Sequence, residues 1–258
     1  MIRFASLGSG SKGNATLIES GQTRVLVDCG FYLREVEERL ERFGIEPQSL
    51  NAILVTHEHN DHIGGVARLA RKYSIPVWMT NGTFANWDDP HVPDVTRFSP
   101  HETFTVGDLQ VQPFPVPHDA REPCHYVVGQ GSGESARRLG VVSDAGSVTP
   151  YMRECLSGCD ALMLEFNHDF EMLMSGPYPP ALKDRVGGPL GHLSNAQSAS
   201  LLAAVDCTRL QYLVLTHLSE KNNTPVLARA AACAALNRDE PWMVCANQGG
   251  GLNWREVV

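Results

Sequence analysis

Three histidines and an aspartate lie within six positions of the chain, directly after an apolar run at residues 52–55. Imidazole and carboxylate groups are ligands suited to zinc and to neighbouring first-row metals. Side chains two residues apart on an extended segment point the same way, so His57 and His59 can share one ion. Asp61 and His62 then point elsewhere, and the spacing predicts two adjacent metals that activate a water molecule between them. The alternative is a solvated, histidine-rich loop after a buried strand.

Other histidines and carboxylates also follow short apolar runs. Asp28 and Asp144 follow two such runs, Glu165 ends a third, and His217 follows a fourth at residues 211–215. The ends of strands are where α/β folds collect ligands. Taken alone, Asp28 is either a turn cap or a carboxylate that orients a metal-binding histidine. Asp144 could likewise cap the next helix, and His217 could bind a backbone carbonyl.

Strands and helices that alternate along the chain must position these residues. The glycine- and serine-rich residues 8–14 lack the P-loop pattern, so a tight turn is favoured over a phosphate cradle. Residues 88–100 are predicted to be an exposed excursion, and residues 172–191 an irregular flap. No repeat, linker or low-complexity tract interrupts the chain, which predicts one domain over residues 1–258. Strands are predicted at 2–7, 15–19, 24–27, 77–79, 102–104, 109–113, 126–128, 139–142, 161–164, 211–215 and 243–246, and helices at 33–43, 66–72, 83–87, 148–156, 196–205 and 225–236.

The composition limits the kind of protein this chain can be. A formal charge of -8 and a pI near 5.7 argue against a broad basic surface for long nucleic acid, and are compatible with a local groove. Seven cysteines without zinc-finger pairing fit a reducing compartment and predict buried small residues. No stretch approaches a membrane span, and residues 2–7 predict a strand in place of a signal peptide. We therefore expect a cytoplasmic protein without a membrane partner.

The motifs resemble those of a known family. The sequence T-H-E-H-N-D-H at residues 56–62, followed in order by the histidines and aspartates above, resembles the metallo-β-lactamase fold superfamily. G-H-L-S-N at residues 191–195 and H-L-S-E-K-N-N at residues 217–223 look like its YycJ (WalJ) branch. The resemblance covers nearly the whole chain, with small departures at Cys29 and Ala145 and a lengthened hairpin expected at residues 129–138. It implies an α/β fold, a four-layer αββα sandwich of two mixed β-sheets flanked by helices.

The resemblance also implies two divalent metal ions and their ligands. Zinc suits a histidine and aspartate ligand set, while manganese and iron stay open because both accept the same groups. By itself, His118 would be a simple loop histidine after residues 115–117. Asp61 is counted among the catalytic residues as well as the ligands. The implied ligands are His57, His59 and His118 for one ion, Asp61, His62 and His217 for the other, and Asp144 as the bridge.

A histidine and a glutamate are implied to act as a catalytic pair. His192 would contact the phosphate and protonate the leaving oxygen, and Glu165 would orient the imidazole and favour its protonated form. The alternative places His192 as a residue at the N-terminus of the helix at residues 196–205. Asn167 and His168 either line the substrate pocket or hold the loop after the strand.

Substrate-binding residues are predicted in the flap and after it. Lys183 and Arg185 would bind phosphates and concentrate positive charge locally, or else form a solvated basic pair on a loop. His192 and Asn195 complete the predicted substrate-binding set.

The resemblance thus implies a binuclear metal-dependent hydrolase that acts on phosphodiesters. A nuclease of the 5′–3′ exonuclease type on DNA or RNA is the leading hypothesis, with a metal-bridging hydroxide as nucleophile. A small cyclic phosphodiester, as in the PhnP branch, is the first alternative, and the acidic charge favours it. A lactone or thioester hydrolase uses the same metal core without needing His192. A metal-binding protein without turnover would require a missing ligand, and no implied ligand is missing. The oligomeric state stays open, with a homodimer as one option.

Overall fold

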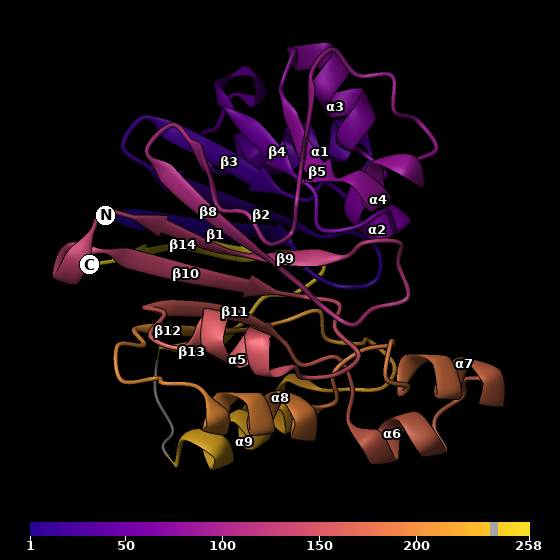
Figure 1. Cartoon of the computed structure of the whole chain (residues 1–258). Coiled ribbons are helices and arrows are strands. Elements are labelled where there is room, and N and C mark those ends of the chain that lie inside the picture. Colours follow the sequence, from indigo (N-terminus) through magenta and orange to yellow (C-terminus); the bar gives the residue numbers. More distant parts are fainter. Residues whose placement is uncertain (238–241) are drawn as a thin grey trace.

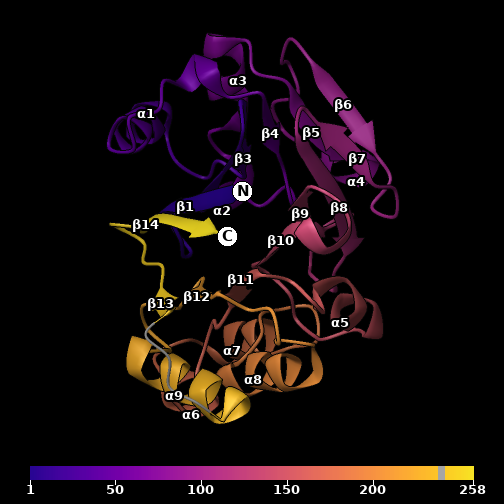
Figure 2. The same cartoon turned by 90° about the vertical axis from the view of Figure 1, so that its left-hand side faces the viewer.

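Two mixed β-sheets pack face to face, and helices cover their outer faces (Figure 1). This computed structural model describes residues 1–237 and 242–258. The layers are stacked as helices, sheet, sheet and helices, which is plain when the molecule is turned by 90° (Figure 2). The predicted four-layer αββα sandwich is confirmed.

Sheet 1 has seven strands in the order β14-β1-β2-β3-β4-β5-β6 within the described residues. Strands β14 to β3 pair antiparallel, whereas β3 to β6 pair parallel. The strands are β1 (Ile2–Gly8), β2 (Ala15–Ser20), β3 (Thr23–Val27), β4 (Ala52–Leu54), β5 (Val77–Thr80), β6 (Val95–Phe98) and β14 (Leu252–Val257).

Sheet 2 repeats the same plan, in the order β13-β12-β11-β10-β9-β8-β7. Strands β7 to β10 pair antiparallel, and β10 to β13 pair parallel. Each sheet therefore brings the carboxyl ends of its parallel strands to one edge, where ligands collect in such folds. The strands are β7 (Phe104–Val106), β8 (Leu109–Pro115), β9 (Cys124–Gln130), β10 (Arg137–Val142), β11 (Ala161–Glu165), β12 (Tyr212–Thr216) and β13 (Met243–Cys245).

The helices cover the two outer faces because each buries one apolar stripe. In α1, Val36 and Leu40 are one turn apart and fully buried against sheet 1. In α8, Ser194 and Gln197 form a capping box that fixes where the helix begins. The described helices are α1 (Leu33–Glu41), α2 (Asn60–Ile63), α3 (Val66–Tyr73), α4 (Asn81–Ala85), α5 (Pro150–Leu156), α6 (Phe170–Ser175), α7 (Pro180–Val186), α8 (Asn195–Ala204) and α9 (Pro225–Leu236).

Three apolar clusters hold the layers together. One lies between the sheets and includes Phe4 and Tyr126, another joins sheet 1 to α1 and α3, and the third joins sheet 2 to α5, α8 and α9. In β8, buried Leu109 and Val111 alternate with the more exposed Gln110 and Gln112, as expected for a strand with one face on the core. None of the helices in the described part of the chain is long and apolar enough to cross a membrane.

Several predicted elements were wrong. The excursion predicted at residues 88–100 contains β6, an edge strand whose largely polar sequence carries little apolar signal. The flap predicted at residues 172–191 contains most of α6 and all of α7, which begins with Pro180 at its first turn, where proline is well tolerated. Strand β14 was not predicted at all. Residues 129–138, a predicted hairpin, do connect β9 to β10 as an antiparallel pair.

Candidate metal centre

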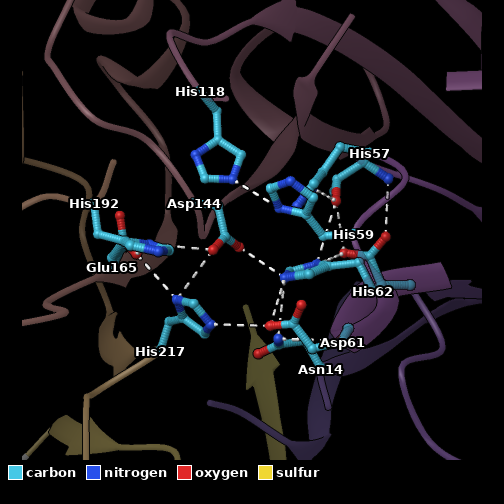
Figure 3. A network of polar contacts seen from close by, with 12 residues as sticks. Asn14, His57, His59, Asp61, His62, His118, Asp144, Glu165, His192 and His217 are labelled. Atoms are coloured by element: carbon cyan, nitrogen blue, oxygen red, sulfur yellow. Dashed lines mark hydrogen bonds and ion pairs between the residues drawn. The ribbon is translucent and has the colours of Figure 1, made fainter. Parts of the chain in front are cut away.

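The predicted metal ligands, together with His192 and Glu165, meet at the edge where the parallel strands of both sheets end (Figure 3). Asp28 follows β3 and the loop with His57 follows β4, both in sheet 1. Asp144 follows β10, Glu165 is the last residue of β11, and His217 follows β12, all in sheet 2. The fold therefore gathers residues from distant parts of the sequence at one place.

His57, His59 and His118 form one group of possible metal ligands. Their ring centroids lie 4.6 to 4.9 Å apart, and one nitrogen of each ring lies within 4.8 Å of the others. The Nε2 atom of His118 is 3.2 Å from Nδ1 of His59. His57 and His118 are buried, whereas the His59 side chain is 29% exposed. The three rings thus surround a point that is open to solvent on the side of His59.

Asp61, His62 and His217 form a second group, whose ligand atoms also lie within 4.8 Å of one another. The Nε2 atoms of both histidines are 3.6 Å from Oδ2 of Asp61. Asp144 contacts two members of the second group, with Oδ2 2.8 Å from His62 Nε2 and Oδ1 3.3 Å from His217 Nδ1, and its carboxylate also shares a possible ligand set with His57 of the first group (Figure 3).

Hydrogen bonds set the orientation of the buried rings. Four histidines each place Nδ1 against an oxygen of the protein, which assigns the proton to Nδ1 and leaves Nε2 as the free ligand atom. The partners at Nδ1 are Thr56 Oγ1 for His57 at 2.9 Å, Asp28 Oδ2 for His62 at 2.8 Å, the Gly191 carbonyl for His118 at 3.0 Å and Glu165 Oε1 for His217 at 3.0 Å.

Three buried polar atoms at the centre of the site test whether metal ions fit it. Nε2 of His57 is buried and has no hydrogen-bond partner among the described residues, whereas Nε2 of His217 and Oδ2 of Asp144 are buried and face other candidate ligands, Asp61 Oδ2 at 3.6 Å and His62 Nε2 at 2.8 Å. A buried acceptor without a donor is costly in free energy. Two imidazole nitrogens and a carboxylate oxygen are suitable ligands for a divalent cation, so the residues present fit metal binding.

Asp28 supports the metal loop from the end of β3. Its carboxylate accepts hydrogen bonds from the Thr56 backbone at 2.8 Å, the Thr56 hydroxyl at 2.8 Å and His62 Nδ1 at 2.8 Å. Asp28 adopts φ 62°, an uncommon conformation for a residue other than glycine. Of the two roles that the sequence left open, the structure therefore places Asp28 behind a candidate ligand, holding its ring.

The tight turn at residues 8–14 also contacts the metal loop. Asn14 closes the turn by accepting from Gly10 N at 2.9 Å and donating to the Gly10 carbonyl at 3.1 Å. Its Nδ2 atom also lies 3.1 Å from His62 Nε2. A Cβ atom on Gly30, in the loop after β3, would lie 1.8 Å from the Asp61 carbonyl, so the close approach of this loop to the metal loop requires glycine there. The tight turn, which was predicted in preference to a phosphate cradle, is confirmed. It supports the candidate site through its contacts with the metal loop.

The electrostatics of the centre suit a cation. Burial alone would raise the pKa of Asp144, but the charges of His217 and His62 hold it well below its ordinary value. Burial alone would lower the pKa of His217, but Asp144 and hydrogen bonds to Asp61 and Glu165 raise it to about 10. The negative potential that favours a proton on His217 also favours a metal ion, and metal binding would release that proton.

His192 and Glu165 form a hydrogen-bonded pair beside the metal ligands. Oε1 of Glu165 lies 2.8 Å from His192 Nδ1, and Oε2 accepts from the backbone of Ala145 at 3.1 Å and of Leu193 at 3.0 Å. Burial opposes a charge on His192, yet Glu165 and Asp144 raise the pKa of its imidazole. The His192 side chain is 21% exposed, whereas Glu165 is fully buried. The pair is therefore built to keep a proton on an imidazole that solvent can reach.

A pocket of about 340 Å³ opens over the metal ligands and reaches α7. His59, Asp61, Asp144, His192 and Arg185 all contribute to its wall. The Arg185 guanidinium is 61% exposed, and its Nε donates to Oδ2 of Asp119 at 2.6 Å.

Comparisons with known proteins identify the family of this chain. A family model described as Beta-lactamase superfamily domain matches residues 23–218. Exodeoxyribonuclease YycJ of Bacillus anthracis is 34% identical over 239 residues, which cover 91% of this chain and 89% of that protein. This chain belongs to the β-lactamase superfamily and, within it, to the YycJ/WalJ family. Exodeoxyribonuclease WalJ of Streptococcus pneumoniae is 34% identical over 233 residues, which cover 88% of this chain and 85% of that protein.

The fold of this YycJ/WalJ family member is also similar to solved structures. The metallo-β-lactamase fold protein YhfI of Bacillus subtilis superposes with a TM-score of 0.74 over 99% of this chain and 100% of that chain, at 16% sequence identity. At this identity, the likeness concerns the fold alone.

Three residues predicted near the substrate lie elsewhere or make other contacts. The amide of Asn195 is buried and pairs with Asn223, with Nδ2 to Oδ1 distances of 2.9 and 2.8 Å in the two directions. Lys183 Nζ donates to the Met174 carbonyl at 2.5 Å and is absent from the pocket wall. His168 is buried, and this burial lowers the pKa of its imidazole to about 4. Of the alternatives for His168, holding the loop after the strand fits best.

The sequence analysis missed three residues at the centre of this family member. Asn14 contacts His62 and Asp119 lies 3.4 Å from His118 Nε2. His125 is buried in β9, with Nε2 3.2 Å from the Asp144 carbonyl and with a buried Nδ1 that has no partner among residues 1–237 and 242–258. The one available signal was that Asp119 directly follows His118 in the sequence.

Proposed function

We propose that this protein is a metal-dependent exodeoxyribonuclease that hydrolyses phosphodiester bonds at the 5′ ends of DNA. Its relatives are named exodeoxyribonucleases, and the chain matches them over most of their length. The structural observation that carries the proposal is one pocket that joins both groups of ligand atoms to the His192–Glu165 pair. Such a pocket combines metal binding with a proton donor, as hydrolysis of a phosphodiester with a poor leaving group requires.

The proposed ligands divide into the two groups described above. His57, His59 and His118 would hold one ion, and Asp61, His62 and His217 would hold the other, with Asp144 between them. Bound divalent cations lower the pKa of water and polarise phosphoryl oxygens. Zinc is the metal we expect because imidazole and carboxylate ligands suit it.

His192 would protonate the leaving oxygen of the DNA sugar. The charge of Glu165 raises the pKa of this imidazole and so favours its protonated form, and Glu165 fixes the ring through Nδ1, so that Nε2 is the atom that can give up a proton. The two backbone donors on the other oxygen of Glu165 hold the carboxylate in place. After proton transfer, the neutral imidazole would be recharged from solvent, to which its side chain is 21% exposed.

Arg185 would bind a phosphate of the substrate at the wall of the pocket. Its guanidinium is held through Nε by Asp119, which leaves the two terminal nitrogens for phosphate oxygens. Lys183 would add positive charge from α7, and Asn195 would act indirectly by fixing the start of α8 behind His192.

A small cyclic phosphodiester is the second candidate substrate. The formal charge of -8 favours it, because a long polyanion is repelled by an acidic protein. A cyclic nucleotide would still need His192 as the acid for its leaving oxygen.

The test compares substrates side by side with the metal-loaded protein. Single- and double-stranded oligonucleotides labelled at the 5′ or 3′ end are incubated with protein that holds zinc or manganese, alongside a cyclic nucleotide and a lactone. We expect metal-dependent loss of the 5′ label as short products, and little turnover of the lactone. The Asp144→Asn variant should lose metal and activity together. Rapid lactone opening with intact oligonucleotides would contradict the proposal, and exclusive cleavage of the cyclic nucleotide would support the second candidate.

A further inference from the structure

A second pocket of about 190 Å³ adjoins the metal site. It lies between the metal loop, α3 and the segment after α4, and its wall includes Glu58, Asn60, Arg68, Asn86 and Trp87. A volume of this size holds about six water molecules, so it has room for a planar ring.

The two pockets share Asn60, which lies exposed at the start of α2. A chain molecule that lies over the metal ligands can therefore continue past Asn60 into the second pocket. Glu58 and Asn60 flank His59, the exposed ligand of the first histidine group. The second pocket thus continues the metal site and is not an isolated hollow.

Glu58 lines this pocket and has one unused hydrogen-bond acceptor. Its Oε1 atom accepts from Arg121 N at 2.7 Å and from Asn86 Nδ2 at 3.1 Å, so the carboxylate is fixed in position. Its Oε2 atom is buried and has no partner within the described part of the chain. A buried acceptor of this kind gains free energy when a bound molecule supplies a donor.

Arg68 provides an unused donor on the other side. It is exposed, and neither a hydrogen bond nor an ion pair joins its guanidinium to another of the residues that the structure describes. The neighbouring Arg71, in contrast, is taken up by two hydrogen bonds to Asp89 at 2.9 and 2.8 Å. Trp87 adds an aromatic side chain that is 8% exposed.

The charge of the wall selects the kind of group that fits. The wall carries three carboxylates, from Glu58, Asp88 and Asp89, and one cation among its described lining residues, Arg68. This excess of negative charge would repel a phosphate. A neutral planar group with an amino donor and a carbonyl acceptor would match Glu58 and Arg68. The nucleobases that carry an exocyclic amine have such edges, and carboxylates accept hydrogen bonds from cytosine N4.

We propose that this pocket is a base-binding subsite for the nucleotide next to the scissile phosphate, and that it prefers cytosine over thymine. This inference rests on the proposed function, because the metal site must hold the DNA backbone for a base to reach the pocket. Trp87 would contact the ring, Glu58 would accept from the exocyclic amine, and Arg68 would donate to the ring carbonyl. Thymine lacks the exocyclic amine and would leave Glu58 Oε2 without a partner.

The experiment measures kcat/KM on three substrates with the zinc-loaded protein. These are an oligomer of deoxycytidine, an oligomer of thymidine of the same length, and bis(p-nitrophenyl) phosphate, which has no base. For the wild type we expect about tenfold faster cleavage of the cytidine oligomer than of the thymidine oligomer, the effect of one hydrogen bond to a charged group. Metal content is measured for every variant because Glu58 lies between two candidate ligands.

Two variants and a matched control complete the design. Glu58→Gln replaces the free acceptor by a donor and should bring the cytidine-to-thymidine ratio to one or below. Arg68→Ala should lower turnover of both oligomers about fivefold relative to the nitrophenyl ester. Arg34→Ala removes another exposed arginine, in α1 and outside both pockets, and should change none of the ratios.

The outcomes separate this inference from the function on which it rests. A wild type that cleaves the oligomers without preference, or a Glu58→Gln variant that keeps the full preference with its metal bound, would overturn the base subsite and leave the nuclease intact. A wild type that cleaves the nitrophenyl ester but neither oligomer would overturn the proposed function, and the subsite with it.

Discussion

Asp28 joins the metal loop to β3 through three hydrogen bonds. Replacing Asp28 by asparagine keeps the size of the side chain. It also places an amide NH2 group, a donor, against one of the three groups that donate to the carboxylate. We expect Asp28→Asn to weaken metal binding about 10- to 100-fold, the usual effect of losing a carboxylate behind a ligating histidine. A titration with buffered zinc measures the affinity. The control is Asp108→Asn, whose carboxylate accepts from residues 22 and 23 at the other end of the sheet. Equal affinities in both variants would show that Asp28 does not orient His62.

His192 permits a test that separates proton transfer from metal binding. His192→Ala should keep the metals and lose about 100- to 10,000-fold in turnover of DNA, the usual contribution of a positioned acid. A nitrophenyl ester needs little protonation of its leaving group, so its hydrolysis should fall much less. Glu165→Gln should show the same difference in weaker form, because it removes the carboxylate that charges the imidazole.

Metal content and both substrates are therefore measured in wild type and in the two variants. Equal losses on both esters, with metal retained, would make His192 a residue that positions the substrate. Loss of metal would make it a ligand, as the closeness of its Nδ1 to Asp144 Oδ1 at 3.2 Å allows.

At the scale of the element, α7 presents two cations that the structure distinguishes. Arg185 lines the pocket, whereas Lys183 is bound to the carbonyl of Met174 at the end of α6. We expect Arg185→Ala to reduce the slope of log affinity for DNA against log salt by about one, because one phosphate contact is lost. Lys183→Ala should change this slope less. Binding of a labelled single strand at several salt concentrations measures both, and equal slopes for wild type and Arg185→Ala would remove Arg185 from the substrate site.

The Asn195–Asn223 pair fixes the start of α8 against the loop before α9. Asn223 Nδ2 also donates to the Phe166 carbonyl at 2.7 Å, after β11, so the pair joins three elements. We expect Asn223→Ala to lower the free energy of unfolding by about 3 kcal/mol and Asn195→Ala by about 2 kcal/mol, since each leaves buried partners unsatisfied. The double variant should lose about 1 kcal/mol less than the sum, because the partners share one interaction.

Urea unfolding of the four proteins measures this coupling. Asn253→Ala, an exposed substitution in β14, is the control and should cost about 0.5 kcal/mol or less. Additive losses in the double variant would mean that the two amides act independently.

At the scale of the whole molecule, Tyr126 links the two sheets directly. Its ring is fully buried in the cluster between the sheets, and its hydroxyl donates at 2.5 Å to the carbonyl of Val55, which directly follows β4 of sheet 1. We expect Tyr126→Phe to cost about 1–2 kcal/mol in the free energy of unfolding, because the carbonyl is left without its donor. Tyr32→Phe, at a side chain that is 72% exposed, is the matched control.

Two probes of the same unfolding curves test the prediction of a single domain. Of the four tryptophans, Trp78, Trp87 and Trp254 lie with sheet 1 and Trp242 with sheet 2, so fluorescence reports mainly on sheet 1, whereas circular dichroism reports on both sheets and all helices. Coincident transitions, shifted together by Tyr126→Phe, are the expected result. A fluorescence transition that precedes the loss of ellipticity would divide the chain into two units.

Part of the fold and of the candidate site could be predicted from the sequence, and part could not. Short apolar runs that lead to His57, Asp144 or Glu165 predicted strands. Because parallel strands of a sheet run in the same direction, their carboxyl ends meet at one edge. Strand β6 was hidden because an edge strand needs few apolar residues, and α7 because its flanking prolines and glycines resemble those of a loop. The contacts of Asn14 and Asp119 depend on how separate loops pack, which no spacing along the chain records.

The pairing of β1 with β14 has a consequence for how the protein is made. Strand β14 lies about 250 residues after β1, so a ribosome needs on the order of 10–50 s to produce it once β1 has been synthesised. During this time the edge of β1 that later pairs with β14 stays open in the nascent chain. The apolar residues Ile2 and Phe4 belong to this unpaired stretch. An unpaired strand edge invites association with other chains. Slow translation should therefore lower the yield of native protein. Refolding of a full-length chain with a destabilised β14 should lower this yield less, because β14 is present from the start.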